Sequence, residues 1–119
     1  MKVVYVAGPF SALTPEGVEA HIQAAEEWGR QIADLGAVPL VPHSIGRHMQ
    51  QIQNYAWWTD ATLELMDRAD AVFFLPGWTE SPGSRGEHAV ATRNDQPVFY
   101  DLESLKDWLD AADVPTGVV

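Results

Sequence analysis

The chain has 119 residues, of which 46% are hydrophobic and 20% charged, and five are tryptophans. This length suits one domain and is too short for two, and the apolar content excludes a disordered chain. The sequence holds no cysteine, which excludes disulfides, thiolate metal sites and a cysteine nucleophile. The formal net charge of −10 argues against binding to a nucleic-acid backbone, which relies on Lys and Arg. A small anion can still bind where the local field is positive.

The apolar segments are short. The longest run, AVFFL at residues 71–75, falls far below the roughly 20 residues that cross a bilayer. MKVVYVAG (1–8) predicts a first strand and lacks the longer apolar region of a signal peptide. We therefore expect a cytosolic protein that does not associate with a membrane.

Strand and helix patterns alternate along the first half of the chain. KVVYVAG (2–8) is apolar at nearly every position, as in a strand covered on both faces. Thr14-Pro15-Glu16 predicts the start of a helix, with an N-cap, a first-turn proline and an acid, and Gly36 predicts its end. AVPLV (37–41) predicts a second strand. Residues 42–53 predict a polar loop of a length usually associated with function.

The alternation continues in the second half. Residues 54–68 have a helical pattern, 71–75 predict a third buried strand, and the segment after Pro76-Gly77 leads into a helix that ends near Asn94. QPVFY (96–100) predicts a fourth strand, Asp101 is the expected cap of a last helix, and VPTGVV (114–119) is expected to be a loose end. Such alternation implies parallel strands joined by right-handed crossovers. We predict a single three-layer α/β domain over residues 1–119.

An anion site is expected at the carboxyl ends of the strands, where ligands of such sheets bind. GPFSA (8–12), PHS (42–44) and GWTESPG (77–83) should converge there. Ser81 as N-cap and Pro82 as first helical residue would leave first-turn N–H groups free for phosphate. The helix dipole supplies only about 0.3–2 kcal/mol, whereas millimolar affinity takes roughly 4 kcal/mol. Further donors are needed, and the candidates are Ser11, Ser81, Ser84, Arg47 and Arg85.

A carboxylate follows this helix start. Glu87 lies four residues after Gly83 and three after Ser84, so the three share a helix face, and helix side chains lean toward the N-terminus. A phosphate at the cap and a carboxylate about two turns deeper would bracket a sugar, and a carboxylate near an anomeric carbon can form a glycosyl-enzyme intermediate. Judged on these residues alone, such a sequence more often forms a plain helix cap followed by a solvent-facing Glu than a catalytic site.

The other polar and aromatic candidates have alternative roles. His43 follows a strand end, where ligand contact and packing as a hydrogen-bonded imidazole are equally expected. Tyr5 is expected in the core, with projection toward a base as the alternative. Trp78, just past a strand end, can stack on a nucleobase, whereas Trp57-Trp58 favours one ring in the core and one at a subunit interface. The histidines lack metal-ligand spacing, so we predict no metal.

The chain resembles the nucleoside 2-deoxyribosyltransferase-like superfamily, in particular its small nucleotide N-glycoside hydrolases and related uncharacterised domains of bacteria and phages. The resemblance rests, in order along most of the chain, on YVAGP (5–9), VPH (41–43), ADAVFFLPGW (69–78) and S-x-G-x-x-x-E over Ser81, Gly83 and Glu87. It implies a flavodoxin-like, Rossmann-like parallel sheet of four to five strands with helices on both faces.

The resemblance also implies residue roles. The family's motif Glu is the nucleophile at C1′ and its motif Ser binds the 5′-phosphate, which gives these roles to Glu87 and Ser81. The expected substrate-binding residues are Tyr5, Gly8, Pro9, Phe10, Ser11, His43, Trp78, Ser81, Gly83 and Ser84. The family often has an Asp eight residues before the Asp of its "AD" pair, which is Asp70 here, and at that position this chain has Thr62. Asp60, His43 and Asp70 are the candidate acid/bases; Asp60 is the nearest acid, although on a helix it points about 200° away.

The activity that the resemblance implies is cleavage of the base–sugar bond of a (deoxy)nucleoside 5′-monophosphate, without a cofactor. It further implies a small-molecule nucleotide or nucleoside as ligand, and a homo-oligomer, a dimer or tetramer, with Trp57 or Trp58 at the contact surface. No nucleic-acid or membrane partner is expected. The alternatives are a nucleoside deoxyribosyltransferase, which hands the same intermediate to another base, a non-catalytic nucleotide-binding module, and a purely structural protein.

Overall fold

Four parallel strands form the centre of the structure, a computed structural model that describes residues 1–112. The expected loose end at 114–119 lies outside the described residues. In chain order the elements are β1 (Val3–Ala7), α1 (Pro15–Asp34), β2 (Val38–Leu40), α2 (Pro42–Met49), α3 (Tyr55–Asp67), β3 (Ala71–Phe74), η1 (Trp78–Glu80), α4 (Pro82–Arg93), β4 (Val98–Phe99) and α5 (Leu102–Ala112).

The strand order is β2-β1-β3-β4. In β1, Val4 pairs with Pro39 of β2, and Val6 pairs with Phe73 of β3. This is the order of the first four strands of the flavodoxin-like 2-1-3-4-5 arrangement, which confirms the predicted three-layer α/β fold. The chain moves from β1 to one neighbour and then returns to the other, so the topological switch point lies between β1 and β3.

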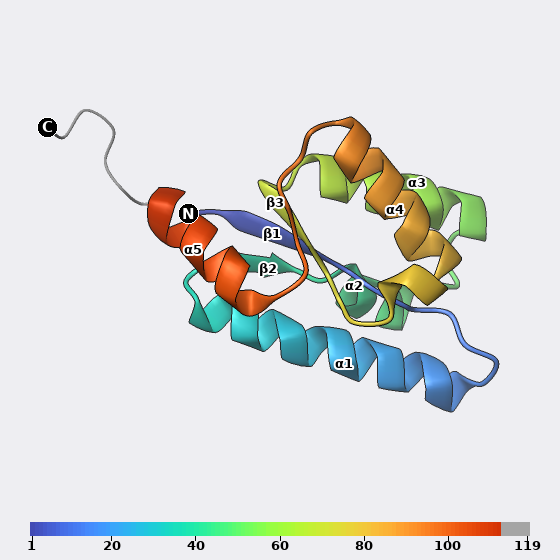
Figure 1. The fold of residues 1–119 in the computed structure, drawn as a ribbon. Helices are drawn as coiled ribbons and strands as arrows, with labels where there is room; N and C mark the ends of the chain where they lie inside the picture. The colour runs from blue at the N-terminus through green and yellow to red at the C-terminus, as the bar shows by residue number, and fades with distance from the viewer. Residues whose placement is uncertain (113–119) are drawn as a thin grey trace, which may run out of the picture.

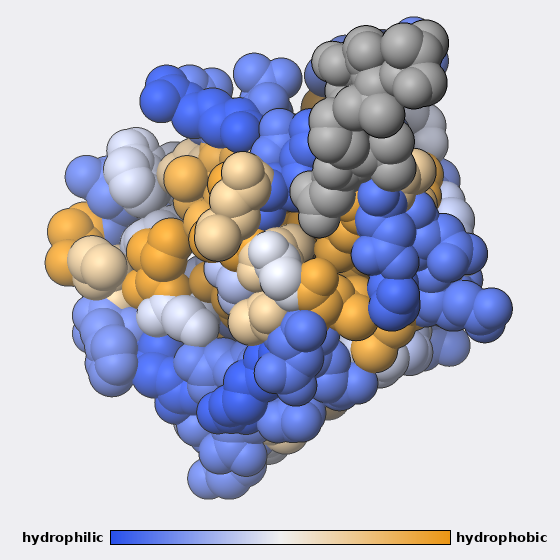
Figure 2. Space-filling view, turned by 90° about the vertical axis from the view of Figure 1, so that its left-hand side faces the viewer, coloured by the Kyte–Doolittle hydropathy of each residue, from blue (hydrophilic) through white to orange (hydrophobic). Residues whose placement is uncertain are grey.

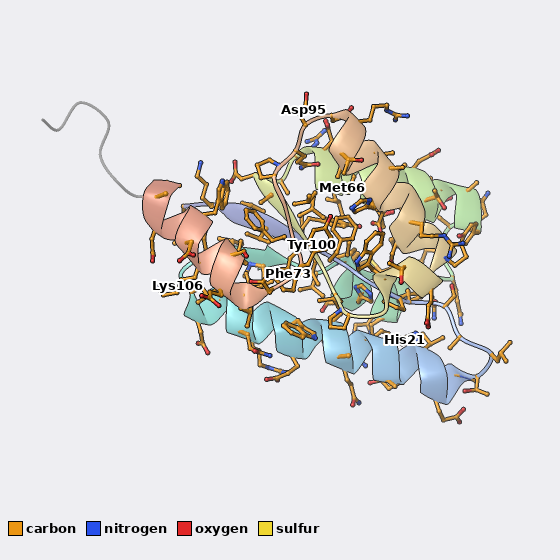
Figure 3. All side chains as sticks on the ribbon, in the orientation of Figure 1. His21, Met66, Phe73, Asp95, Tyr100 and Lys106 are labelled. Atoms are coloured by element: carbon orange, nitrogen blue, oxygen red, sulfur yellow. The ribbon has the colours of Figure 1, made fainter. Side chains whose placement is uncertain are left out.

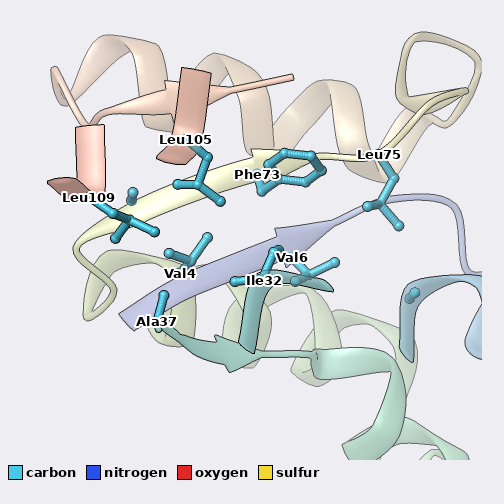
Figure 4. Packing of buried hydrophobic residues seen from close by; sticks show 10 residues of the cluster. Val4, Val6, Ile32, Ala37, Phe73, Leu75, Leu105 and Leu109 are labelled. Atoms are coloured by element: carbon cyan, nitrogen blue, oxygen red, sulfur yellow. The ribbon is translucent and has the colours of Figure 1, made fainter. Parts of the chain in front are cut away.

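Each face of the sheet has its own apolar core, because successive strand residues point to opposite faces. Val4, Val6 and Phe73 face α1 and α5 (Figure 4), and they pack there with Ile32 and Leu105. These two helices lie on one side of the sheet, and α3 and α4 lie on the other (Figure 1).

The second core lies under α3 and α4. It contains Tyr5, Ala7, Val72 and Phe74 from the strands and Met66 from α3. Figure 3 labels one residue from each core, with Phe73 on the α1 side and Met66 on the α3 side. The runs VVYVA and AVFF are apolar at every position because both faces of β1 and β3 are covered.

The end of the molecule where the strands begin shows the same layering. Figure 2 views it from the left of Figure 1, and apolar side chains form a band there between polar surfaces above and below. Within residues 1–112, none of the helices combines the length and the apolarity needed to cross a membrane.

Helix starts follow local capping chemistry. The side chain of Thr14 accepts a hydrogen bond from Gly17 N, and that of Asp101 accepts one from Ser104 N. The side chain of Ser81 accepts one from Ser84 N. These three expected caps are confirmed, because each depends only on residues within one turn.

The predicted loop at 42–53 is wrong over its first part, since residues 42–49 form α2. Val41, the N-cap residue of α2, makes no capping hydrogen bond with its side chain, so the local sequence gives only a weak signal for a helix. Long-range contacts hold α2 instead. Arg47 pairs with Glu19 and with Glu26 of α1, the latter at 2.9 Å, and Ser44 donates to Glu26 at 2.7 Å.

Gly8 is required by close packing at the end of β1. A Cβ added there would lie 2.7 Å from Leu75 Cδ1 and 3.0 Å from Leu75 Cβ. We therefore expect Gly8→Ala to lower the free energy of unfolding by about 1–3 kcal/mol, measured by urea denaturation. Gly86→Ala is the control, because an added Cβ meets nothing within 4 Å; on α4 it should raise stability by up to about 1 kcal/mol. Equal effects of the two substitutions would contradict this packing.

Candidate functional site

A cleft of about 1340 Å³ opens at the carboxyl edge of the sheet. Its walls are the loop after β1, one face of α1, the start of α2, one face of α3, the segment from the end of β3 to α4, and the first turns of α4. This is the switch point between β1 and β3, where doubly wound sheets bind their ligands. The three segments expected to converge from the sequence do so here.

Glu87 and Tyr5 meet inside this cleft. Tyr5 stands on β1 with no exposed surface, and its hydroxyl donates to Glu87 Oε2 at 2.5 Å. Glu87 comes from the second turn of α4. The side chain of Thr62 on α3 lies close enough to the Tyr5 hydroxyl to lower its pKa. The hydrogen bond between the central strand and α4 therefore fixes the position of one carboxyl group.

Burial controls the ionisation of the pair. Loss of solvent raises the pKa of Glu87 from 4.5 to about 7, and the hydrogen bond from Tyr5 opposes this rise. The pKa of Tyr5 lies well above its usual value, first because of burial and then because of the charge and hydrogen bond of Glu87. Tyr5 therefore remains a donor, and Glu87 exchanges its proton near neutral pH. Carboxyl groups with pKa values shifted in this way cluster at functional sites.

The start of α4 differs from the expected cradle of free amides. Pro82 has no N–H, and the N–H of Ser84 is bonded to Ser81 Oγ at 3.3 Å. Gly83 N–H is the first-turn amide left without a partner among the described residues, and a Cβ on Gly83 would meet nothing within 4 Å. One open amide at the positive end of the helix remains for an anion.

The two arginines considered as anion donors are engaged elsewhere. Arg47 pairs with Glu19 and Glu26 on α1, and Arg85 Nη1 donates to the carbonyl of Thr79 at 2.8 Å. Neither residue lines the cleft. The sequence could not show this, because the partners of Arg47 lie 21 and 28 residues away.

Two buried polar atoms in the cleft walls have no hydrogen-bond partner. They are His43 Nδ1 and Ser84 Oγ. Within residues 1–112, every other buried side-chain nitrogen or oxygen has a hydrogen-bond partner. The other ring nitrogen of His43, Nε2, lies 3.2 Å from Gly8 O and 3.0 Å from Pro9 O. Nε2 must carry the proton for these acceptors, so Nδ1 presents a lone pair. Burial lowers the pKa of His43, which favours the neutral ring.

Most of the expected site residues lie together. The cleft is lined by Tyr5, Gly8, Pro9, Phe10, Ser11, His43, Ser81, Gly83, Ser84 and Glu87. Tyr5 lies in the core, as expected, and its hydroxyl reaches into the cleft, where it bonds to Glu87.

Three expected candidates lie elsewhere. Asp60 is exposed on α3 and does not line the cleft, because the helix turns it away from the face that carries Thr62. Asp70 precedes β3 at the opposite edge of the sheet, where its carboxylate accepts from Val3 N at 2.7 Å. Trp78 also lies outside the cleft lining; η1 directs its ring onto His88, with a centroid distance of 4.3 Å.

The α3 wall of the cleft was not expected from the sequence. Tyr55, Trp58, Thr59, Thr62 and Leu63 line it. Their spacing of three or four residues was the available signal, but it does not distinguish a cleft wall from a core face. Within the described residues, no group of three His, Asp or Glu side chains has an arrangement suited to a metal ion.

Comparison with known families gives one finding. Residues 2–100 match the model of a family described as a domain of unknown function (DUF4406). The match spans every element that contributes to the cleft. No curated protein matches the chain.

The raised pKa of Glu87 makes a prediction about stability. The folded protein holds this proton more tightly than the unfolded chain, so the contribution is fully present below about pH 4.5 and is lost as the pH rises through about 7. Glu87→Gln removes the titration and keeps an acceptor for Tyr5. Its stability relative to wild type should increase by up to about 3 kcal/mol between pH 4 and pH 9, as measured by urea unfolding. Glu103→Gln, on an exposed part of α5, is the control. A difference that does not change with pH would refute the burial of this carboxyl.

Proposed function

The chain belongs to the DUF4406 family, and we propose that it is an N-glycosidase that cleaves the base–sugar bond of a (deoxy)nucleoside 5′-monophosphate. One observation carries the proposal. The cleft holds a partly buried carboxyl group, Glu87, whose pKa is raised to about 7 and whose hydrogen-bond donor is the hydroxyl of Tyr5. A carboxyl group so placed can attack an anomeric carbon.

The spacing along α4 supports a sugar phosphate as the bound unit. Ser81 and Glu87 are six residues apart, a rise of about 9 Å along the helix. The 5′-phosphate would lie at the helix start, near Gly83 N–H and Ser81, and the sugar would lie deeper, with C1′ toward Glu87. The loop from Gly8 to Ser11 forms the facing wall of the cleft and would enclose the sugar.

The reaction would proceed in two displacements. In the first, an oxygen of the Glu87 carboxylate bonds to C1′ while the bond from C1′ to the base nitrogen breaks, and the base leaves with that electron pair and a proton from water. In the second, a water oxygen bonds to C1′, the ester bond to Glu87 breaks, and the water proton passes to solvent. Both transition states have oxocarbenium character.

Tyr5 and Thr62 would position the nucleophile. The Tyr5 hydroxyl donates to one carboxylate oxygen, Oε2, and leaves Oε1 to react. Thr62 stands where the resembled family often has an Asp, and its side chain lies near the Tyr5 hydroxyl, whose pKa it lowers. The α3 residue at this position therefore lies beside Tyr5 and does not itself provide a carboxylic acid.

The presence of Thr62 in place of the family's Asp favours a second candidate function, a nucleotide-binding module without turnover. Glu80 and Glu87 are the acids among the described residues that line the cleft, so no Asp or Glu on α3 would protonate the leaving base. A transferase would use the same Glu87 ester and differs only in admitting a second base in place of water.

The proposed ligand is a small molecule, and a homo-oligomer is part of the proposal. Large hydrophobic side chains are exposed close together in sequence, where α2 ends and α3 begins: Met49, Ile52, Tyr55 and Trp57. Exposed apolar groups of this kind mark contact surfaces between proteins. Trp57, 46% exposed, is one of the two tryptophans, Trp57 or Trp58, that the sequence suggested for such a surface.

We expect the purified protein to release free base from at least one of the common nucleoside or 2′-deoxynucleoside 5′-monophosphates, as detected by chromatography. Glu87→Gln should lower kcat by on the order of 10³-fold or more, because it removes the nucleophile, and should leave nucleotide binding in place. Wild-type turnover by Glu87→Gln would remove Glu87 from the mechanism. Binding of nucleotides without release of base by the wild type would favour the non-catalytic module.

The pH dependence of kcat/KM tests the ionisation of Glu87 separately. The attacking form is the carboxylate, so kcat/KM should rise with pH through a midpoint near 7. Tyr5→Phe removes the hydrogen bond that lowers this pKa, so its profile should move to higher pH. A profile for Tyr5→Phe displaced to lower pH, or no dependence on pH in the wild type between 5 and 9, is the contrary result.

A further inference from the structure

One face of α3 forms a wall of the cleft, and its position relative to Glu87 can be followed residue by residue. Thr62 lines the cleft beside Tyr5, whose pKa its side chain lowers, and the Tyr5 hydroxyl in turn bonds to Glu87. Trp58 lies four residues earlier on the same helix face, and it also lines the cleft. Four residues are a rise of about 6 Å, so Trp58 stands one helical turn from the residue beside the reacting pair, toward the mouth of the cleft.

The Trp58 ring is held in place by its surroundings. Its Nε1 donates to the carbonyl of Gln50 at 2.9 Å. Its ring and the ring of Trp57 pack perpendicular to each other, with centroids 4.8 Å apart and an interplanar angle of 89°. Because the indole N–H is already bonded to the backbone, Trp58 presents aromatic carbon surface to the cleft.

The remaining side chains of this wall add few hydrogen-bond donors. The hydroxyl of Thr59 donates to Tyr55 O at 3.1 Å, and that of Thr62 donates to Thr59 O at 3.1 Å. No charged side chain of α3 lines the cleft. The wall therefore suits an uncharged planar group bound by stacking, whereas the start of α4, with its open amide and helix dipole, suits an anion.

From this division of the cleft we infer that Trp58 is the stacking platform for the base of the nucleotide, and that affinity follows the aromatic area of the base, with purine nucleotides bound more tightly than pyrimidine nucleotides. The inference rests on the proposed function and names its substrate class. Trp78 does not take this role, because His88 stacks on its ring and Phe74 packs against it. Stacking does not depend on the hydrogen-bonding groups at the edges of the base, so it does not distinguish bases by those groups.

The experiment separates the base from the sugar phosphate. Binding constants of the four common 2′-deoxynucleoside 5′-monophosphates and of 2-deoxyribose 5-phosphate are measured by calorimetry in the Glu87→Gln variant, which prevents turnover. Trp58→Ala in this background should weaken the binding of purine nucleotides by roughly 5- to 150-fold, the range for loss of one base–aromatic stack. It should leave the affinity for deoxyribose 5-phosphate within about 2-fold, since stacking involves the base alone.

Two control variants address folding and position. Trp58→Phe keeps an aromatic face without the bond to Gln50, and it should retain part of the preference for nucleotides over the sugar phosphate. Trp57→Ala changes the neighbouring ring, which does not line the cleft, and it should weaken nucleotide binding far less than Trp58→Ala. Unchanged affinity of Trp58→Ala for the sugar phosphate also shows that the variant is folded.

The outcomes distinguish this inference from the function on which it rests. Nucleotide binding that survives Trp58→Ala, a preference for pyrimidines, or an equal loss of sugar-phosphate and nucleotide binding would overturn the role of Trp58 and leave the function of Glu87 standing. If neither the nucleotides nor the sugar phosphate bind to the protein with Trp58 intact, the proposed function is overturned, and the stacking role with it.

Discussion

The hydrogen bond between Tyr5 and Glu87 connects the centre of the sheet to the helix that carries the proposed nucleophile. A carboxyl group buried without a donor would remain protonated at neutral pH, and one in full contact with water would be a weak, mobile nucleophile. The single donor leaves Glu87 with a pKa of about 7. Tyr5 is itself fixed on both sides, since it pairs with Leu40 of β2 and Val72 of β3. The rigidity of the parallel sheet is thereby transmitted to the Glu87 carboxylate.

Features that lower stability are concentrated around the same cleft. The raised pKa of Glu87 and the unpartnered atoms of His43 and Ser84 all occur in its walls, whereas the two cores on either face of the sheet are built from apolar side chains. Proteins retain unsatisfied or ionisable buried groups mainly where function requires them. The distribution of these groups thus supports the cleft as the functional site independently of the geometry of Glu87.

The sequence predicted those features that depend on near neighbours. The caps at Thr14, Ser81 and Asp101 and the apolar runs of β1 and β3 follow from local chemistry and periodicity. Other features depend on distant contacts. Helix α2 is held by ion pairs to α1, the Tyr5–Glu87 bond joins residues 82 positions apart, and η1 turns Trp78 away from the cleft. No periodic pattern separates the cleft-lining Trp58 from the neighbouring Trp57.

The central claim, that Glu87 forms a glycosyl ester at C1′, is tested most directly by the stereochemistry of the reaction. With a cleaved 2′-deoxynucleotide and methanol as a competing acceptor, the product is a methyl glycoside of deoxyribose 5-phosphate whose anomeric configuration can be assigned by NMR. Two successive displacements at C1′ predict the configuration of the substrate. A product of inverted configuration would show a single displacement by the acceptor and would contradict the covalent role of Glu87.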